Sequence, residues 1–195
     1  MRSALASGTR LAFLAASSTV ALLVSSCGSL APHHVDLHGA EHSPLDASDA
    51  KGNVLLFITV DCPIANGYAP TIRKLVKDFA PKGVRFYLIH VDPDVTEEVA
   101  RRHTKDFGYE SPVLIDSEHA LVQRLEATHT PEAFVLSRDS RVVYRGRIDD
   151  WYGDLGKKRP APRTHELRAA LDALLEGRPV PVARTEPVGC FIPEI

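Results

Sequence analysis

The sequence predicts an α/β fold with a mixed central sheet: parallel core strands, a terminal antiparallel hairpin and flanking helices. Two short apolar runs, 54–60 and 84–91, are rich in β-branched and aromatic residues, as strands covered on both faces are. Apolar residues recur at helical spacing after each run, so strands and helices alternate along the chain. Two later strand-like segments are separated only by a short polar turn, which predicts a hairpin at the sheet edge.

Each element has its own signal, in chain order. The helix after the first strand repeats apolar residues over 72–79 and is stopped by Pro81 and Gly83. Thr164 can cap the last helix, and Gly177 stops it. The other expected elements are a helix over 96–107, a strand over 112–115, a helix over 117–127, and strands over 132–136 and 141–146.

Length and composition favour a single domain and exclude several protein classes. A chain of 195 residues fits one hydrophobic core. Its 23 basic and 25 acidic residues leave a net charge of -2, which gives no reason to expect nucleic acid as a partner. Three cysteines cannot form a disulfide framework, and the sequence contains neither a CxxC pair nor a zinc-type spacing.

Residues 1–27 have the pattern of an export signal. Arg2 and Arg10 supply positive charge, and the 14 uncharged residues of 11–24 are too few to span a bilayer core of about 30 Å comfortably. The sequence Val-Ser-Ser-Cys over 24–27 resembles the bacterial lipobox, which implies acylation of Cys27 and anchoring of an exported protein in the cell envelope. Glycine follows this cysteine in place of an acidic retention residue, so we expect the periplasmic side of the outer membrane. The alternative is an ordinary cleaved signal with an incidental cysteine.

Residues 28–50 are expected to form a flexible tether between the anchor and a domain over 51–177. The segment contains two prolines, two glycines and four histidines, with little apolar periodicity. Its His34, His38 and His42 would share one face of a helix, a spacing compatible with metal binding, but the prolines and glycines argue against a helix there.

The strongest chemical pattern is a cysteine directly after the first strand. Residues 57–65 read Phe-Ile-Thr-Val-Asp-Cys-Pro-Ile-Ala, and Thr130 with Pro131 comes immediately before a later strand. These two motifs resemble the thioredoxin superfamily, and most closely its AhpC/TSA-like redoxin branch. The resemblance covers roughly residues 45–177. It implies a thioredoxin-like fold in which a cis-proline, Pro131, lies beside a reactive Cys62.

The position of Cys62 also supports nucleophilic chemistry without the family. A helix N-terminus lowers a thiol pKa from about 8.5 because its free N–H groups favour the thiolate. Pro63 suits the first position of such a helix, and the carboxyl end of a parallel strand is a usual place for active sites. The alternative interpretation is a small buried apolar residue.

The kind of thiol chemistry is left open, because each known pattern is incomplete. Ala65 stands where thioredoxins have their second cysteine, which excludes dithiol exchange within one loop. Thr59 and Cys62 match the peroxiredoxin pattern Pro-x-x-x-Thr-x-x-Cys, whose threonine can hold a peroxide oxygen, but Leu55 replaces its proline. The two-cysteine motif of copper chaperones is also absent.

Three weaker candidates accompany Cys62. Pro131 lies roughly where peroxiredoxins have an activating arginine, so Arg145 or Arg147 is a candidate substitute. His129 is near enough in sequence to Pro131 to face the thiol, although a surface loop histidine is the simpler interpretation.

Cys190 is the candidate resolving thiol. It lies 128 residues after Cys62 in a proline-rich tail, 178–195, which can cross a domain in extended conformation without secondary structure of its own. Gly189 would allow close backbone approach. The sequences over 144–150 and 188–192 resemble a subgroup of bacterial redoxin-domain proteins. A resolving role, a permanent disulfide and an unpaired thiol all remain open.

The expected function is therefore thiol-dependent oxidoreduction outside the cytoplasm. Cys62 would attack a disulfide or a peroxide, Cys190 would resolve the intermediate, Thr59 and Pro131 would complete the site, and an external thiol would restore both cysteines. No cofactor or resident metal is expected. The alternative is a non-catalytic scaffold, or a copper-binding module that uses Cys62 and Cys190 as ligands.

Overall fold

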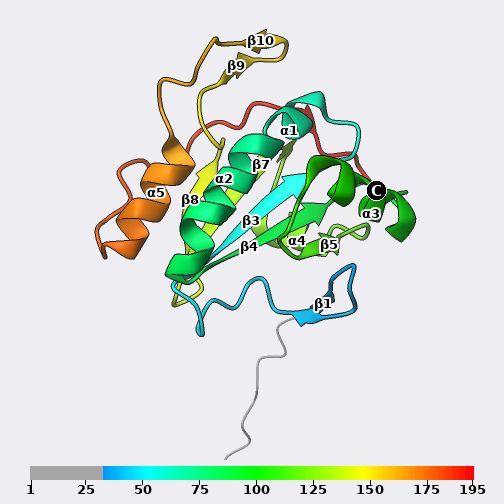
Figure 1. Cartoon of the computed structure of the whole chain (residues 1–195), viewed down its shortest axis with the longest axis horizontal. Coiled ribbons are helices and arrows are strands. Elements are labelled where there is room, and N and C mark those ends of the chain that lie inside the picture. The colour runs from blue at the N-terminus through cyan, green and yellow to red at the C-terminus, as the bar shows by residue number, and fades with distance from the viewer. Residues whose placement is uncertain (1–32) are drawn as a thin grey trace, which may run out of the picture.

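The computed structural model describes residues 33–195, which form a five-stranded mixed sheet with helices on both faces (Figure 1). Its strands are β3 (Gly52–Ile58), β4 (Val84–His90), β5 (Val113–Ile115), β7 (Glu132–Ser137) and β8 (Val142–Gly146). They lie in the order β5-β4-β3-β7-β8, with β3, β4 and β5 parallel and with β7 antiparallel to both of its neighbours. This arrangement confirms the predicted mixed α/β sheet with its antiparallel hairpin.

The helices and the short strands complete the fold. The helices are α1 (Pro63–Gly67), α2 (Ala69–Phe79), η1 (Ala80–Lys82), α3 (Glu97–Phe107), α4 (Ala120–Leu125) and α5 (Glu166–Leu175). The short strands are β1 (His34–Val35), β2 (Glu41–His42), β6 (His129–Thr130), β9 (Tyr152–Asp154), β10 (Lys157–Lys158) and β11 (Cys190–Phe191). Pairing joins β1 to β2, β9 to β10, and β11 to β6, each time antiparallel.

The core is divided into two clusters by the sheet, and the alternation along β3 explains why. Val54, Leu56 and Ile58 pack against α2, α3 and α5, whereas Leu55 and Phe57 pack against α4 on the other face. Every residue of β3 is buried. Burial of each large apolar side chain stabilises the fold by about 1.5–3 kcal/mol. This burial holds β3 in place, and with it the start of the loop that follows its carboxyl end.

The N-terminal segment differs from the expected tether. Residues 33–50 form the β1–β2 hairpin and then pack on the domain, with Leu37 only 5% exposed in the core. The Leu37 N–H donates to the Val113 carbonyl at 3.1 Å, and the Asn53 side-chain amide donates to the carbonyls of Pro44 and Asp46, both at 2.9 Å. The prediction of a flexible tether is therefore wrong for 33–50. Gly39 and Pro44 lie in its turns, and Leu37 reaches the core beside the edge strand β5.

The proposed export signal and Cys27 lie outside the described residues. Within 33–195, no helix has the length and apolar character needed to cross a membrane. Figure 1 shows the β1–β2 hairpin below the sheet, α1 above it, and β9 with β10 at the top of the molecule.

Leu37→Ala should lower the free energy of unfolding by about 2–3 kcal/mol, because it removes buried methyl groups and leaves a cavity. Urea denaturation of the full-length chain measures this loss. Val35→Ala is the matched control, since Val35 is 57% exposed on the same hairpin, and it should change stability by less than about 0.5 kcal/mol. Equal, small effects of the two changes would show that residues 33–50 do not contribute to the core.

Candidate active site

Cys62 lies at the junction between the central strand and α1. It follows the carboxyl end of β3 and is the N-cap of α1, where its sulfur accepts a hydrogen bond from the Ala65 N–H at 3.4 Å. Pro63 occupies the first turn of the helix, as the sequence predicts. The side chain of Cys62 is almost completely buried, with 1% of the residue exposed.

Thr130 and Pro131 lie beside this thiol. The Thr130–Pro131 peptide bond is cis, as the resemblance to thioredoxins implied. The Cys62 thiol donates to the Thr130 carbonyl at 2.9 Å, and the Thr130 hydroxyl lies 3.2 Å from the hydroxyl of Thr59. The structure therefore brings Cys62, Thr59 and Pro131 to one place, with Thr130 between them.

The C-terminal tail returns to the same place and covers Cys62. Cys190 pairs with Thr130 in the β11–β6 ladder, and the Ile192 N–H donates to the Thr128 carbonyl at 3.0 Å. A Cβ at Gly189 would overlap the Thr130 carbonyl, so only glycine allows this approach. The tail thus forms a short strand of its own, which the sequence did not predict. Residues 187–193 are called the strap below.

Neither Cys62 nor Cys190 is in a disulfide, and each of the two thiols shifts the pKa of the other. Burial is the largest influence on Cys62 and raises its pKa, but hydrogen bonds from the Cys190 thiol, the Ala65 N–H and the Thr130 hydroxyl together bring the pKa below its ordinary value. The Thr130 carbonyl opposes them, because it accepts a proton that only the neutral thiol has. Burial and the contact with Cys62 raise the pKa of Cys190 to about 12. Cys62 is therefore the more acidic thiol of the pair.

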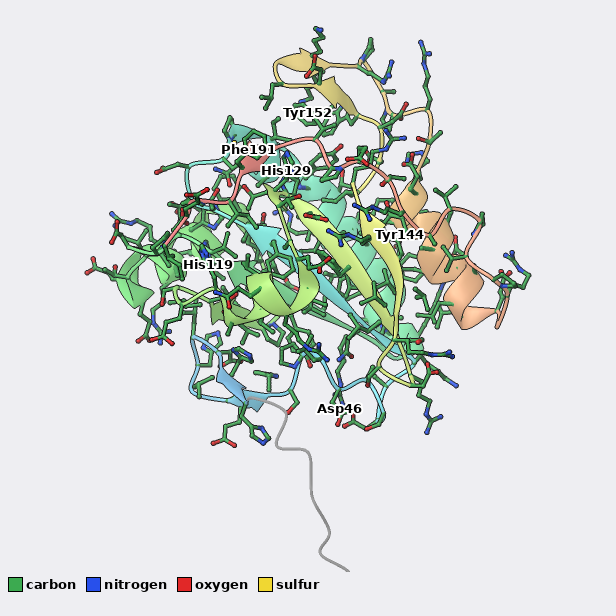
Figure 2. The ribbon with its side chains drawn as sticks, turned by 180° about the vertical axis from the view of Figure 1, so that it is seen from behind. Asp46, His119, His129, Tyr144, Tyr152 and Phe191 are labelled. Carbon is green, nitrogen blue, oxygen red and sulfur yellow. The ribbon has the colours of Figure 1, made fainter. Side chains whose placement is uncertain are left out.

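The weaker candidates are engaged elsewhere. Arg145 forms an ion pair with Glu132 at 3.2 Å, and Arg147 pairs with Glu166. Figure 2 shows the side chains of His129 and Phe191 next to each other, and their ring centroids are 4.5 Å apart. The neighbours of these three side chains thus give none of them a direct role at Cys62.

Two site residues were missed by the sequence analysis. The Asp92 carboxylate accepts from the Val60 N–H at 3.1 Å, and the Asn66 side-chain amide donates to the Val60 carbonyl at 2.8 Å. Both backbone polar groups of Val60, two positions before Cys62, therefore have hydrogen-bond partners. Asp92 follows β4, the parallel neighbour of β3, so the rule that parallel strands end at one edge could have identified it.

A metal centre is not supported by the part of the chain that the structure describes. No group of three or more His, Cys, Asp or Glu side chains in residues 33–195 is arranged to hold a metal ion. His42 instead pairs with Asp36 at 2.8 Å, within the segment whose histidine spacing was noted above.

Comparisons with known proteins identify a family and similar structures. The AhpC/TSA family model matches residues 28–145, whereas no curated protein matches the chain. Crystal structures of an uncharacterized conserved protein from Geobacillus kaustophilus and a hypothetical protein from Sinorhizobium meliloti 1021 are similar. The first has 31% identity, a TM-score of 0.74, and coverage of 85% of this chain and 90% of that chain. The second has 27% identity, a TM-score of 0.70, and coverage of 82% and 88%.

A structure with lower sequence identity shares the fold. It is a secreted disulfide oxidoreductase from Mycobacterium tuberculosis, with 17% identity, a TM-score of 0.53, and coverage of 76% of this chain and 96% of that chain. At this identity the likeness concerns the fold alone. Together with the observed sheet order, it confirms the thioredoxin-like fold that the sequence predicted.

Gly189→Ala should expose Cys62, because the added methyl group overlaps the Thr130 carbonyl and displaces the strap. We expect the alkylation rate of reduced Cys62 to rise about tenfold, equivalent to a loss of about 1.4 kcal/mol in strap docking. Mass-spectrometric mapping of the labelled cysteine measures it. Val182→Ala, an exposed position of the same tail, should leave the rate unchanged. An unchanged rate in Gly189→Ala would show that the strap does not shield the thiol.

Thr130→Val should raise the pKa of Cys62, since it removes a hydroxyl donor that favours the thiolate. The pH dependence of Cys62 alkylation gives the value directly. Thr130→Ser keeps the hydroxyl and should keep the pKa. If valine and serine behave alike, the hydroxyl has no influence on the thiolate.

Proposed function

The chain belongs to the AhpC/TSA family, and from this membership we propose that it is a thiol-dependent oxidoreductase with Cys62 as nucleophile and Cys190 as resolving thiol. Thr59 and Pro131 complete the site around them. The substrate is a disulfide, and an external thiol returns the pair to its reduced form.

The convergence of Cys62 and Cys190 on Thr130 is the observation that supports this proposal most strongly. The two cysteines are 128 positions apart in the sequence, but the Cys62 thiol donates to the Thr130 carbonyl and Cys190 pairs with Thr130 in the β11–β6 ladder. The two thiols are also differentiated, because Cys62 favours the thiolate and Cys190 retains its proton. The nucleophile has to react first and needs the lower pKa. Cys190 has to ionise only after the mixed disulfide forms, when the Cys62 sulfur carries no charge to oppose it.

The proposed cycle has two exchange steps. The Cys62 thiolate attacks one sulfur of the substrate disulfide, forms a mixed disulfide and releases the other sulfur as a thiolate. Cys190 then gives up its proton to the released thiolate and attacks the Cys62 sulfur. The second substrate sulfur leaves, so the substrate is reduced by two electrons while a Cys62–Cys190 disulfide forms. Two equivalents of an external thiol reverse this oxidation.

Disulfide exchange is favoured over peroxide reduction by the surroundings of the thiol. The hydroxyl of Thr59, the residue that matches the peroxiredoxin pattern, contacts the Thr130 hydroxyl. The two arginines that were candidates to activate a peroxide are paired with Glu132 and Glu166. The experiment below tests a peroxide as the alternative substrate.

The place of action is part of the proposal. The pattern of residues 1–27 supports export to the cell envelope and a lipid anchor at Cys27, and we propose the periplasmic side of the outer membrane. Metabolic labelling with a radioactive fatty acid tests the acylation of Cys27. It should label the wild type and not Cys27→Ser.

The decisive experiment compares Cys62→Ser with Cys190→Ser, both in a full-length Cys27→Ser background. Reduced protein is mixed with an insulin disulfide substrate, and in parallel with hydrogen peroxide, and the products are mapped by mass spectrometry. Cys62→Ser should react with insulin and with hydrogen peroxide no faster than a free thiol in solution does. Cys190→Ser should accumulate a mixed disulfide on Cys62, because the resolving step is absent. Val182→Ala serves as the matched control and should react as the parent does.

Three results would contradict the proposal. A pair that is already oxidised after purification and resists dithiols would indicate a structural disulfide. Unreactive thiols, or tight stoichiometric copper binding that requires both sulfurs, would favour the scaffold or metal-binding alternative. If hydrogen peroxide oxidises Cys62 and the insulin disulfide does not, the substrate would be a peroxide and not a disulfide.

A further inference from the structure

We propose that residues 152–163, which contain the β9–β10 hairpin, bind an acidic stretch of the protein substrate beside the disulfide that Cys62 attacks. Residues 152–163 are called the basic segment below. The proposal rests on the function proposed above, since it names the class of substrate for that reaction. This class is a protein that carries several carboxylates close to its disulfide.

The basic segment carries an excess of positive charge. Its four cationic side chains are Lys157, Lys158, Arg159 and Arg163. Its one acidic residue, Asp154, pairs with Lys157 at 2.9 Å, and Arg159 pairs with Asp150 at 3.3 Å. Neither Lys158 nor Arg163 forms an ion pair with another residue of the described chain, 33–195. Both side chains are exposed, so their charges are available to a negatively charged partner.

The hairpin also forms a hollow on which such a partner can rest. The hollow has a volume of about 390 Å³, and Lys157, Lys158 and Arg159 line it together with Gly153 and Asp154. The Lys158 ammonium lies 3.9 Å from the ring centroid of Trp151, which holds this long side chain against an aromatic face. A side chain that is already held loses less conformational freedom when a partner binds it.

The packing of the core does not account for the outer part of the hairpin. At its base, the Asp150 carboxylate accepts from the Thr164 N–H at 2.9 Å, and the Trp151 carbonyl accepts from the Arg159 N–H at 2.8 Å. Beyond this base every residue of 153–158 is exposed, and Leu155 near the tip is 57% exposed. A firmly attached hairpin thus projects into solvent with an apolar residue and unpaired cations on it.

The basic segment is close to the helix that begins at the thiol. Tyr152 lies against the end of α1, since a Cβ at Gly67 would overlap the Tyr152 hydroxyl. Gly67 is five residues after Cys62, which is about 7.5 Å along a helix. An extended substrate chain spans about 17 Å in five residues. Carboxylates within a few residues of the attacked disulfide can therefore reach the basic segment.

A protein partner fits the placement of this surface better than an anionic membrane does. The β1–β2 hairpin, which is the part of the fold nearest to the proposed anchor, lies below the sheet, whereas β9 and β10 lie at the top of the molecule (Figure 1). Attraction between exposed charges is screened beyond about 8 Å at physiological salt. The basic segment would thus lie on the side away from the lipid.

The test compares two synthetic peptides that contain the same intramolecular disulfide, flanked on one side by four glutamates or by four lysines. Reduced full-length Cys27→Ser protein is mixed with each peptide, and chromatography measures the rate of peptide reduction. At a salt concentration of about 0.01 M we expect the glutamate peptide to react at least about fivefold faster. At about 1 M the screening length falls to about 3 Å, so this preference should disappear.

A double variant, Lys158→Glu/Arg163→Glu, should reverse the preference, because it removes the two unpaired cations and adds two carboxylates. The matched control is Lys51→Glu/Lys77→Glu, which makes the same change in net charge on exposed side chains. Lys51 precedes β3 at the end opposite Cys62, and Lys77 lies in the last turn of α2, so this variant should keep the preference. The ratio of the two rates is measured within one protein, so a partly unfolded variant lowers both rates and leaves the ratio unchanged.

Equal rates for the two peptides at low salt would overturn the proposal, and so would a preference that the control variant also removes. Suppose that the rates are equal and that phosphatidylglycerol vesicles bind the wild type more strongly than Lys158→Glu/Arg163→Glu. The basic segment would then recognise a membrane and not a substrate. A protein that reduces neither peptide would instead refute the proposed function, whatever its surface binds.

Discussion

The site depends on Thr130, a fully buried residue that contacts each of its parts. Its carbonyl accepts from the Cys62 thiol, its hydroxyl lies against Thr59, and its backbone pairs with Cys190. The cis peptide to Pro131 follows directly. Loss of a hydrogen-bond partner at such a buried position costs about 1–3 kcal/mol per unsatisfied group. One residue therefore couples the reactivity of the thiol, the attachment of the strap and the local backbone.

The rest of the architecture holds the opposite side of the site. β3 is buried along its whole length, so the position at which it ends is fixed by the core. Asp92 and Asn66 then hold the Val60 peptide groups, and the His103 ring contacts the Asn66 side-chain oxygen at 2.8 Å. The Cys62 loop is thus rigid, whereas the strap is held by few contacts. Movement at this site is expected in the strap.

The fold and part of the site could be predicted from the sequence, because strong local signals marked them. Continuous apolar runs identified β3 and β4, and a cysteine after a strand identified Cys62. Leu37 was missed because a few buried apolar side chains among turn residues leave no periodic pattern. The pairing of Cys190 with Thr130 could not be read from a proline-rich tail, since only tertiary contact determines its register. Thr130 itself was noted only as the neighbour of Pro131.

The docking of residues 33–50 has a consequence for orientation. Residues 33–50 pack on the domain and therefore cannot act as a spacer. Six residues of chain length, from Cys27 to His33, then separate the proposed lipid from the fold. Fully extended, they reach at most about 20 Å. The β1–β2 hairpin lies below the sheet in Figure 1, and α1 lies above it. An anchored molecule would stay close to the bilayer, with the β1–β2 hairpin as the part of the fold nearest to its anchor.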